Sequence, residues 1–177
     1  LTLIQDWREM VRRQVSQLGF LLGRDAYKRR RRLALREVVD NMAMPLTLYR
    51  RDFGIDFDNR VPANLRTPPF FEAELYAVLL HLFTNALKAV RDEQVSKIAV
   101  TAQWKKGVLH IFMLDTGTGV DRGKREEVFK PFVTTSTPDL VLGVGTGLGL
   151  AIVRDTLSAY NGSVQFIDPD RFVTQEN

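Results

Sequence analysis

The sequence predicts an α+β protein of two layers, with helices on one side of a mostly antiparallel sheet. Residues 71–90 and 148–160 have the pattern of helices, and residues 97–104 and 108–114 have the pattern of strands. The short segment Lys105–Gly107 between these strands is typical of a tight hairpin turn. The second strand is almost wholly apolar, so we expect it to be covered on both faces. One helical layer packed on one sheet accommodates all four segments.

The remaining segments extend this pattern. Residues 3–22 place apolar side chains at steps of three and four, which predicts an amphipathic helix. A second helical pattern begins at Leu33 and must end near Pro45, because proline disfavours helix in the residue before it. Residues 55–58 alternate as a short strand, and residues 163–167 are predicted to form the last strand.

Composition limits the class of protein. The chain has 177 residues, of which 45% are hydrophobic and 26% charged, as in ordinary globular domains. No apolar run approaches the roughly 18 residues of a membrane span, so we expect a cytoplasmic domain, cut from a parent protein whose membrane anchoring is left open. The absence of cysteine excludes disulfides and thiolate metal sites, and two histidines are too few for a structural zinc site.

Basic residues are concentrated near the N-terminus. The net charge is +4, and ten of the 25 basic residues fall between Arg8 and Arg36. The run at 28–32 has no interleaved aromatic residue, which favours a solvated linker or helix face over a nucleic-acid contact. A domain boundary near residues 24–32 is expected, and nucleic acid is not an expected partner.

Three polar residues share one face of the helix predicted at 71–90. His81, Asn85 and Lys88 are four and three residues apart, so they can be presented together to a ligand. An amide oxygen is a hard ligand suited to Mg²⁺, and a lysine adds a positive charge. A solvated polar face is an equally good interpretation of this segment by itself.

Two further segments lie in the long loop from Asp115 to Gly147. Asp115 ends a predicted strand and can accept a hydrogen bond from an exocyclic amine, while Gly117 and Gly119 let the backbone approach a flat ring. A plain turn is the alternative. Phe129 and Phe132 stand at a proline bend, where they could anchor the hinge of a loop, although core packing is the simpler interpretation.

The segment from Gly143 to Leu150 has alternate glycines and leads directly into a helix. Such a backbone can turn several N–H groups towards one anion, and the helix start adds its positive end, so a phosphate site is predicted. A Walker loop is excluded because no lysine closes the segment. A dinucleotide-binding fingerprint is excluded because the segment follows a long loop late in the chain. Loops of that length usually have a functional role, such as covering a ligand.

Taken in order, these four segments resemble the GHKL superfamily of ATPases and kinases, most closely the catalytic and ATP-binding domain of sensor histidine kinases, over about residues 33–167. The resemblance implies a Bergerat-type ATP-binding fold, with ATP and Mg²⁺ as cofactors, Asn85 as the Mg²⁺ ligand and Asp115 on the adenine amino group. The candidate catalytic residues are Lys88 and His81, although His81 stands where the kinase pattern commonly has asparagine and could there polarise a nucleophile. The implied ATP-binding residues are Asn85, Lys88, Asp115, Gly117, Gly119, Phe129, Phe132, Thr134, Gly143, Gly145, Thr146, Gly147, Leu148 and Gly149.

The same resemblance implies a role in two-component signal transduction, in which the γ-phosphoryl group passes to a histidine outside this chain. Residues 1–32 would be a helical linker or the end of a dimerisation element, and residues 33–177 the ATP-binding catalytic domain. The implied partners are a histidine-bearing dimerisation domain of the same parent, a response regulator and a second copy of the parent. A GHKL-type ATPase is an alternative, but that branch has glutamate where His81 stands. A nucleotide-gated interaction module is the other alternative.

Overall fold

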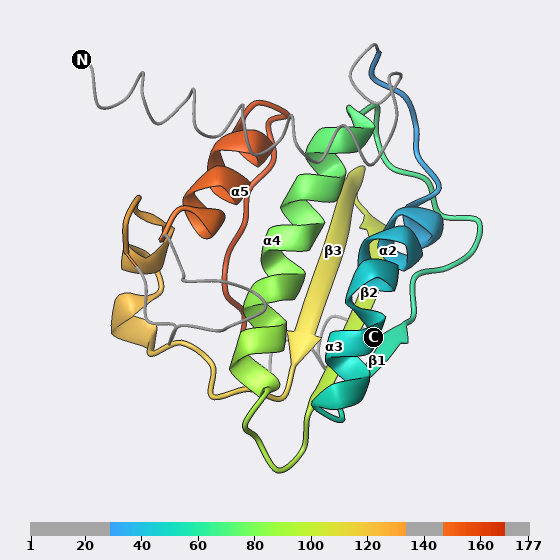
Figure 1. Ribbon diagram of the computed structural model, residues 1–177. Helices are drawn as coiled ribbons and strands as arrows, with labels where there is room; N and C mark the ends of the chain where they lie inside the picture. Colours follow the sequence, from blue (N-terminus) through green and yellow to red (C-terminus); the bar gives the residue numbers. More distant parts are fainter. Residues whose placement is uncertain (1–28, 134–146, 169–177) are drawn as a thin grey trace.

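A three-stranded sheet carries the helices on one of its faces (Figure 1). The computed structural model describes residues 29–133 and 147–168, and the statements below concern these residues. The strands are β1 (Asp56–Asn59), β2 (Lys97–Lys105) and β3 (Val108–Asp115), in the order β1-β2-β3. The predicted two-layer α+β fold is therefore confirmed.

The helices lie side by side over the sheet, with α2 on one side of α4 and α5 on the other (Figure 1). Pro45 lies in a short 3-10 turn that ends α2, as predicted. The chain then turns into α3, which the sequence pattern did not predict. The helical elements are α2 (Leu35–Ala43), η1 (Met44–Leu46), α3 (Thr47–Asp52), α4 (Glu72–Val90), η2 (Arg122–Lys124), η3 (Glu127–Phe129) and α5 (Gly149–Ser158).

The described sheet is mixed: its longer pairing is antiparallel, as predicted, and its shorter pairing is parallel. Strands β2 and β3 form the predicted antiparallel hairpin, and Lys106 and Gly107 both adopt positive φ in its turn. Strand β1, however, pairs parallel to β2, with Asp56 opposite Lys97. Parallel neighbours need a crossover connection, and α4 lies in the connection between these two strands.

Strand β3 is partly or fully buried at all positions between its two end residues. Of its residues, Phe112 alone is buried, while Leu109, Ile111 and Met113 are partly buried against the main core. The helical layer covers the face that carries these three residues, and β3 stands at one edge of the described sheet. Phe112 alternates with them onto the opposite face and is nevertheless buried, so neither face of β3 is bare.

Residues 163–167 do not form the predicted strand. The Phe166 ring instead packs against Phe129 with centroids 5.4 Å apart, and the Asp168 carboxylate pairs with the Arg125 guanidinium at 2.8 Å. These side-chain contacts hold the segment against η2 and η3, and it has no ladder partner among the described strands.

The core lies between α4 and the sheet. Phe83 and Leu87 of α4 are fully buried, and the ring of Phe57 from β1 meets Phe83 edge to face at 5.0 Å. Burying a side chain of this size contributes roughly 1.5–3 kcal/mol, so α4 is firmly fixed to the sheet. The opposite side of this helix can therefore present polar side chains at fixed positions.

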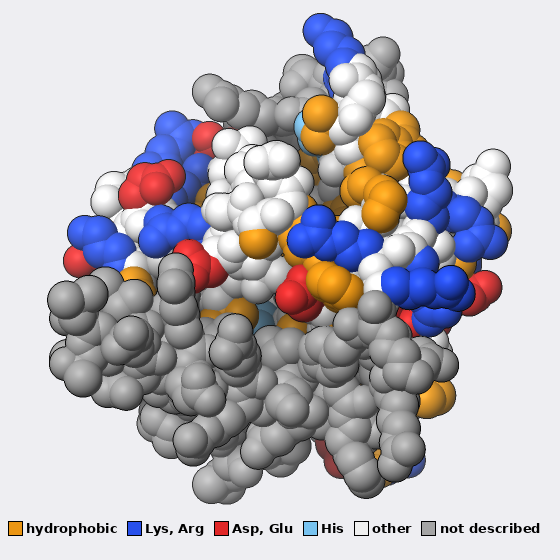
Figure 2. All heavy atoms as spheres, turned by 90° about the horizontal axis from the view of Figure 1, so that it is seen from above, with side chains coloured by type: hydrophobic (Ala, Val, Ile, Leu, Met, Phe, Trp, Pro, Cys, Tyr) orange, Lys and Arg blue, Asp and Glu red, His pale blue; other side chains and the backbone are white. Residues whose placement is uncertain are grey.

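The basic segment is attached to the domain at its end. The Arg31 backbone exchanges two hydrogen bonds of 3.0 Å with Phe70, and the Arg30 guanidinium lies 4.5 Å from the centre of the Tyr160 ring. Basic side chains elsewhere on the face in Figure 2 lie in several separate places with acidic side chains nearby.

The helix predicted at residues 3–22 is outside the described residues, and the boundary at residue 32 stays a prediction. None of the described helices is both long and apolar enough to cross a membrane.

Candidate functional site

One stripe of α4 runs along the candidate site. His81, Asn85 and Ala89 are four residues apart, so they follow one another along one side of the helix, with Phe83 and Leu87 turned into the core. At a rise of 1.5 Å per residue, the stripe from His81 to Ala89 is about 12 Å long. The structure gives the Asn85 side chain, in the middle of the stripe, no hydrogen bond to any described residue. Its amide oxygen is available to a ligand.

Gly117 packs against the Ala89 end of this stripe. A Cβ atom on Gly117 would lie 2.6 Å from the Ala89 Cβ and 2.8 Å from the Ala89 carbonyl oxygen, so only glycine fits without movement. The Gly117 N–H also donates a hydrogen bond of 2.9 Å to Asp115 Oδ1. This close contact and this turn hold the Asp115 carboxylate beside the end of α4.

The Asp115 carboxyl is partly removed from water although the residue as a whole is exposed. This desolvation raises the pKa of Asp115, and the hydrogen bond from the Gly117 N–H acts in the opposite direction. With Oδ1 engaged by Gly117, Oδ2 is left to accept a further hydrogen bond. Gly119, with φ +70° and no atom within 4 Å of its would-be Cβ, belongs to the open part of the same loop.

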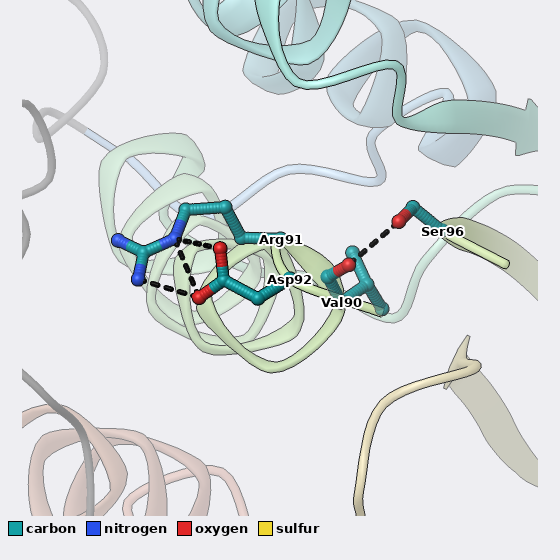
Figure 3. Close-up of polar contacts among 4 residues, drawn as sticks. All are labelled: Val90, Arg91, Asp92 and Ser96. Carbon is teal, nitrogen blue, oxygen red and sulfur yellow. Dashed lines mark hydrogen bonds and ion pairs between the residues drawn. The ribbon is translucent and has the colours of Figure 1, made fainter. Parts of the chain in front are cut away.

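Two polar contacts lie at the C-terminal end of α4, immediately after Ala89 (Figure 3). The Ser96 hydroxyl donates a hydrogen bond of 2.7 Å to the Val90 carbonyl oxygen, which also accepts one of 3.2 Å from the Glu93 N–H in the turn after the helix. The Arg91 guanidinium pairs with the Asp92 carboxylate at 2.7 Å, an exposed contact worth at most about 1 kcal/mol. Ser96 is therefore the more important of the two contacts for the position of Ala89. Neither Ala89 nor Ser96 was predicted, although the four-residue spacing from Asn85 could have identified Ala89.

Gly149 packs against the His81 end of the stripe. A Cβ atom on Gly149 would lie 3.4 Å from His81 Nδ1, so the imidazole ring lies against the first residue of α5. No side chain caps this helix start, and its N–H groups carry partial positive charge. Burial lowers the pKa of His81 and so favours the neutral form of the ring. Its Nε2 atom is buried and has no hydrogen-bond partner within the described residues.

Gly147 and Phe132 join the two ends of the long loop. The Phe132 N–H donates a hydrogen bond of 3.0 Å to the Gly147 carbonyl oxygen. Gly147 has φ +68°, a backbone conformation that favours glycine. A Cβ atom at this position would also lie 2.5 Å from the Phe132 carbonyl carbon, so there is no room for a side chain. Phe132 also has a positive φ of 67°, and its side chain is 58% exposed. The chain therefore reaches the start of α5 at a fixed place.

The structure separates the other predicted site residues into three groups. Phe129 is 3% exposed and packs under Arg154 of α5, so it belongs to the core, and Leu148 is buried and begins α5. Lys88 is partly buried on α4, three residues beyond Asn85. The predicted residues that lie outside the described part of the chain are Thr134, Gly143, Gly145 and Thr146.

These contacts produce an elongated site. Asp115 and Gly117 mark one end, the start of α5 marks the other, and Asn85 lies between them on α4. A ligand that fits needs a hydrogen-bond donor at the first end and negative charge at the second. A nucleotide with its base beside Asp115 and its phosphates at α5 meets both requirements.

Comparison with known proteins agrees with this geometry. Residues 71–175 match the family described as "Histidine kinase-, DNA gyrase B-, and HSP90-like ATPase". This chain belongs to that family. The match extends from the start of α4 past α5, and so includes both ends of the elongated site. The predicted ATP-binding function is confirmed, whereas the Mg²⁺ ion stays a prediction.

Similar proteins include a transport sensor protein and a sensor histidine kinase. The C4-dicarboxylate transport sensor protein DctB of Rhizobium meliloti is 37% identical over 91 residues, which are 51% of this chain and 14% of DctB. The sensor histidine kinase ZraS of Escherichia coli O157:H7 is 35% identical over 91 residues, 51% of this chain and 18% of ZraS. The chain therefore spans less than a fifth of the length of these relatives.

Solved structures place the chain among histidine kinase catalytic domains. Full-length ShkA in complex with AMPPNP superposes with a TM-score of 0.66 and 27% identity, over 77% of this chain and 27% of ShkA. The catalytic domain of the histidine kinase ThkA superposes with a TM-score of 0.63 and 25% identity, over 73% of this chain and 80% of that domain. This chain is therefore an ATP-binding domain of the histidine-kinase type.

Proposed function

We propose that this domain is the donor half of a sensor histidine kinase, which binds ATP with Mg²⁺ and transfers the γ-phosphoryl group to a histidine outside the chain. The observation that carries this proposal is the stripe of α4 enclosed between two glycine contacts, Gly117 on Ala89 and Gly149 on His81. It supports a nucleotide lying along α4, with the adenine at one end and the phosphates at the other.

Each residue of the stripe and its flanks has a proposed role. Asp115 accepts a hydrogen bond from the adenine amino group, and Asn85 provides an oxygen ligand for Mg²⁺. Lys88 places positive charge near the phosphates. Phe129 and Leu148 are buried and support the site from the core. The remaining proposed ATP contacts, through backbone groups or loop side chains, are Gly117, Gly119, Phe132, Thr134, Gly143, Gly145, Thr146, Gly147 and Gly149.

Phosphoryl transfer depends mainly on position and charge neutralisation, so the domain needs no nucleophile of its own. The bound Mg²⁺ would neutralise charge on the phosphates. Backbone N–H groups at the start of α5 would hold the phosphate end, and Lys88 would offset charge that develops during transfer. His81 is neutral and lies against Gly149, a position from which it can polarise a group near the phosphates. His110 lies on β3 opposite Gln103 and outside the stripe. The acceptor histidine therefore belongs to another domain.

The partners follow from this reaction. We propose a histidine-bearing dimerisation domain in the same parent, which forms a homodimer, and a response regulator that receives the phosphoryl group. The named relatives, a transport sensor protein and a sensor histidine kinase, support this assignment. The basic segment at 28–32 leads from the N-terminal residues into the domain, as a connection to such an element would.

Incubation of the 177-residue chain with γ-labelled ATP tests the proposal. We expect Mg²⁺-dependent nucleotide binding, no label on the chain alone, and acid-labile label on an added histidine-bearing helix of the parent. Label on His81 or His110 would overturn the view that the acceptor lies outside the chain. Steady release of phosphate by the chain alone, with no transfer, would support the ATPase alternative instead.

A further inference from the structure

The buried imidazole of His81 has an unusual environment for a polar group. A buried nitrogen without a partner is costly, by about 1–3 kcal/mol, and native proteins rarely keep one without reason. His81 Nε2 is buried and has no hydrogen-bond partner in the part of the chain that the structure describes. Both His81 and Asn85 therefore offer unused polar atoms, one turn apart on the same side of α4.

The surroundings keep this imidazole in the form that can bind a metal ion. The ring lies against Gly149 at the start of α5, where the helix end carries partial positive charge that disfavours a second proton. Burial acts in the same direction by lowering the pKa of His81. Neutral imidazole is a nitrogen ligand, whereas the Asn85 amide offers an oxygen.

We propose that His81 and Asn85 together form a mixed nitrogen and oxygen site for the nucleotide-bound cation, and that this site prefers a first-row transition-metal ion to Mg²⁺. The inference rests on the proposed nucleotide function of the same site. Mg²⁺ favours oxygen ligands, whereas affinity for imidazole rises from Mn²⁺ to Co²⁺. Phosphate oxygens discriminate little among these ions, so the imidazole is the source of the preference.

The site depends on the nucleotide for its remaining ligands. No group of three or more His, Cys, Asp or Glu side chains that could hold a metal ion occurs within residues 29–133 and 147–168. Two protein ligands are too few to hold Mn²⁺ or Co²⁺ tightly, so phosphate oxygens and water must complete the coordination. We therefore expect little binding of either ion to the 177-residue chain without ADP.

Calorimetry of ADP binding in saturating Mg²⁺, Mn²⁺ or Co²⁺ tests the preference. We expect ADP to bind the wild-type chain more tightly with Co²⁺ than with Mg²⁺, with Mn²⁺ between them. The His81→Asn variant replaces the imidazole by an oxygen ligand, and the ratio of its ADP affinities in Co²⁺ and in Mg²⁺ is expected to fall to about one, whatever its absolute affinity. His110→Asn is the matched control, because it removes the other histidine of the chain, and its preference should equal that of the wild type.

Electron paramagnetic resonance of the Mn²⁺–ADP complex gives a second readout, in which the wild-type spectrum alone can refute the proposal. A directly bound imidazole produces coupling to ¹⁴N, which should be present in the wild type and in His110→Asn and absent in His81→Asn. Lack of this coupling in the wild type would overturn the proposal, as would equal ion preferences in the wild type and His81→Asn. Failure of ADP to bind the wild type with any of the ions would refute the nucleotide function itself. Should His81→Asn fail to fold, His81→Gln serves in its place.

Discussion

Substitution of Gly117 by alanine tests whether α4 and the loop after β3 are held at a fixed separation. The new methyl carbon would lie 2.6 Å from Ala89 Cβ and 2.8 Å from both the carbonyl carbon and the carbonyl oxygen of Ala89. Two of these three atoms are helix backbone, which cannot swing aside, and α4 is anchored by the buried Phe83 and Leu87. The loop that carries Asp115 must therefore move.

Overpacking of this kind costs about 1–3 kcal/mol, and the rigid helix favours the upper part of that range. For a domain of this size each kcal/mol lowers Tm by about 2–4 °C, so a cost of about 2–3 kcal/mol lowers Tm by about 4–12 °C. Displacement of Asp115 should also weaken ADP binding. Thermal unfolding followed by calorimetry measures the first effect, and isothermal titration with ADP measures the second.

Two companion variants separate the contact with Ala89 from other effects. Gly119→Ala meets no atom within 4 Å and carries only the penalty of alanine at φ +70°, about 1–2 kcal/mol. Ala89→Gly removes one of the three short contacts, so Gly117→Ala should cost less in that background, with a coupling of at least about 0.5 kcal/mol. An unchanged Tm for Gly117→Ala, or strict additivity with Ala89→Gly, would refute the reasoning.

Three other predictions concern side chains of the site and of its attachment. Asn85→Ala should abolish the Mg²⁺ dependence of ADP binding measured by calorimetry, and an unaltered Mg²⁺ response would place the metal elsewhere. Asp115→Asn should weaken ATP binding tenfold or more, since a hydrogen bond to a charged group contributes about 1.5–3 kcal/mol. Because desolvation raises the pKa of Asp115, its carboxylate should take up a proton at a higher pH than an ordinary aspartate does. During acidification, wild-type ATP affinity should therefore begin to fall at that higher pH, and Asp115→Asn should remove this dependence. Tyr160→Phe removes the hydroxyl that donates to Glu74 and accepts from the Phe71 N–H, and should cost about 1–2 kcal/mol in urea unfolding. Desolvation and Glu74 raise the pKa of Tyr160 from 10.0 to about 12, so the stability that this hydroxyl contributes is complete below pH 10 and is lost as pH rises towards 12. A wild-type curve equal to that of Tyr160→Phe across this interval would contradict the assignment.

Local patterns predicted the elements whose shape depends on neighbours in the chain. The predicted helix at 71–90 is α4, and the predicted hairpin is β2 and β3 with its turn at Lys106 and Gly107. Helix period and turn chemistry involve only a few consecutive residues, so the sequence contains them directly. The same locality placed His81 and Asn85 on one side of α4.

Elements that depend on distant partners were predicted poorly. Residues 55–58 were recognised as a strand, but their parallel pairing with β2 depends on the crossover through α4. Residues 163–167 have strand-like composition, yet Phe166 packs on Phe129 and no ladder forms with the described sheet. Composition measures how well a segment suits a strand, but its hydrogen-bond partner is set elsewhere in the chain.

The sequence by itself determined the chemical character of the site: an amide on α4, a carboxylate at the end of a strand, and glycines before a helix. Only the tertiary structure decided that Gly117 meets Ala89 and that Gly149 meets His81, which gives the site its two ends. These contacts join residues far apart in the chain, and they exist because α4 packs on the sheet while α5 packs on α4. Packing of whole elements, which no local pattern encodes, therefore turned separate polar residues into one site.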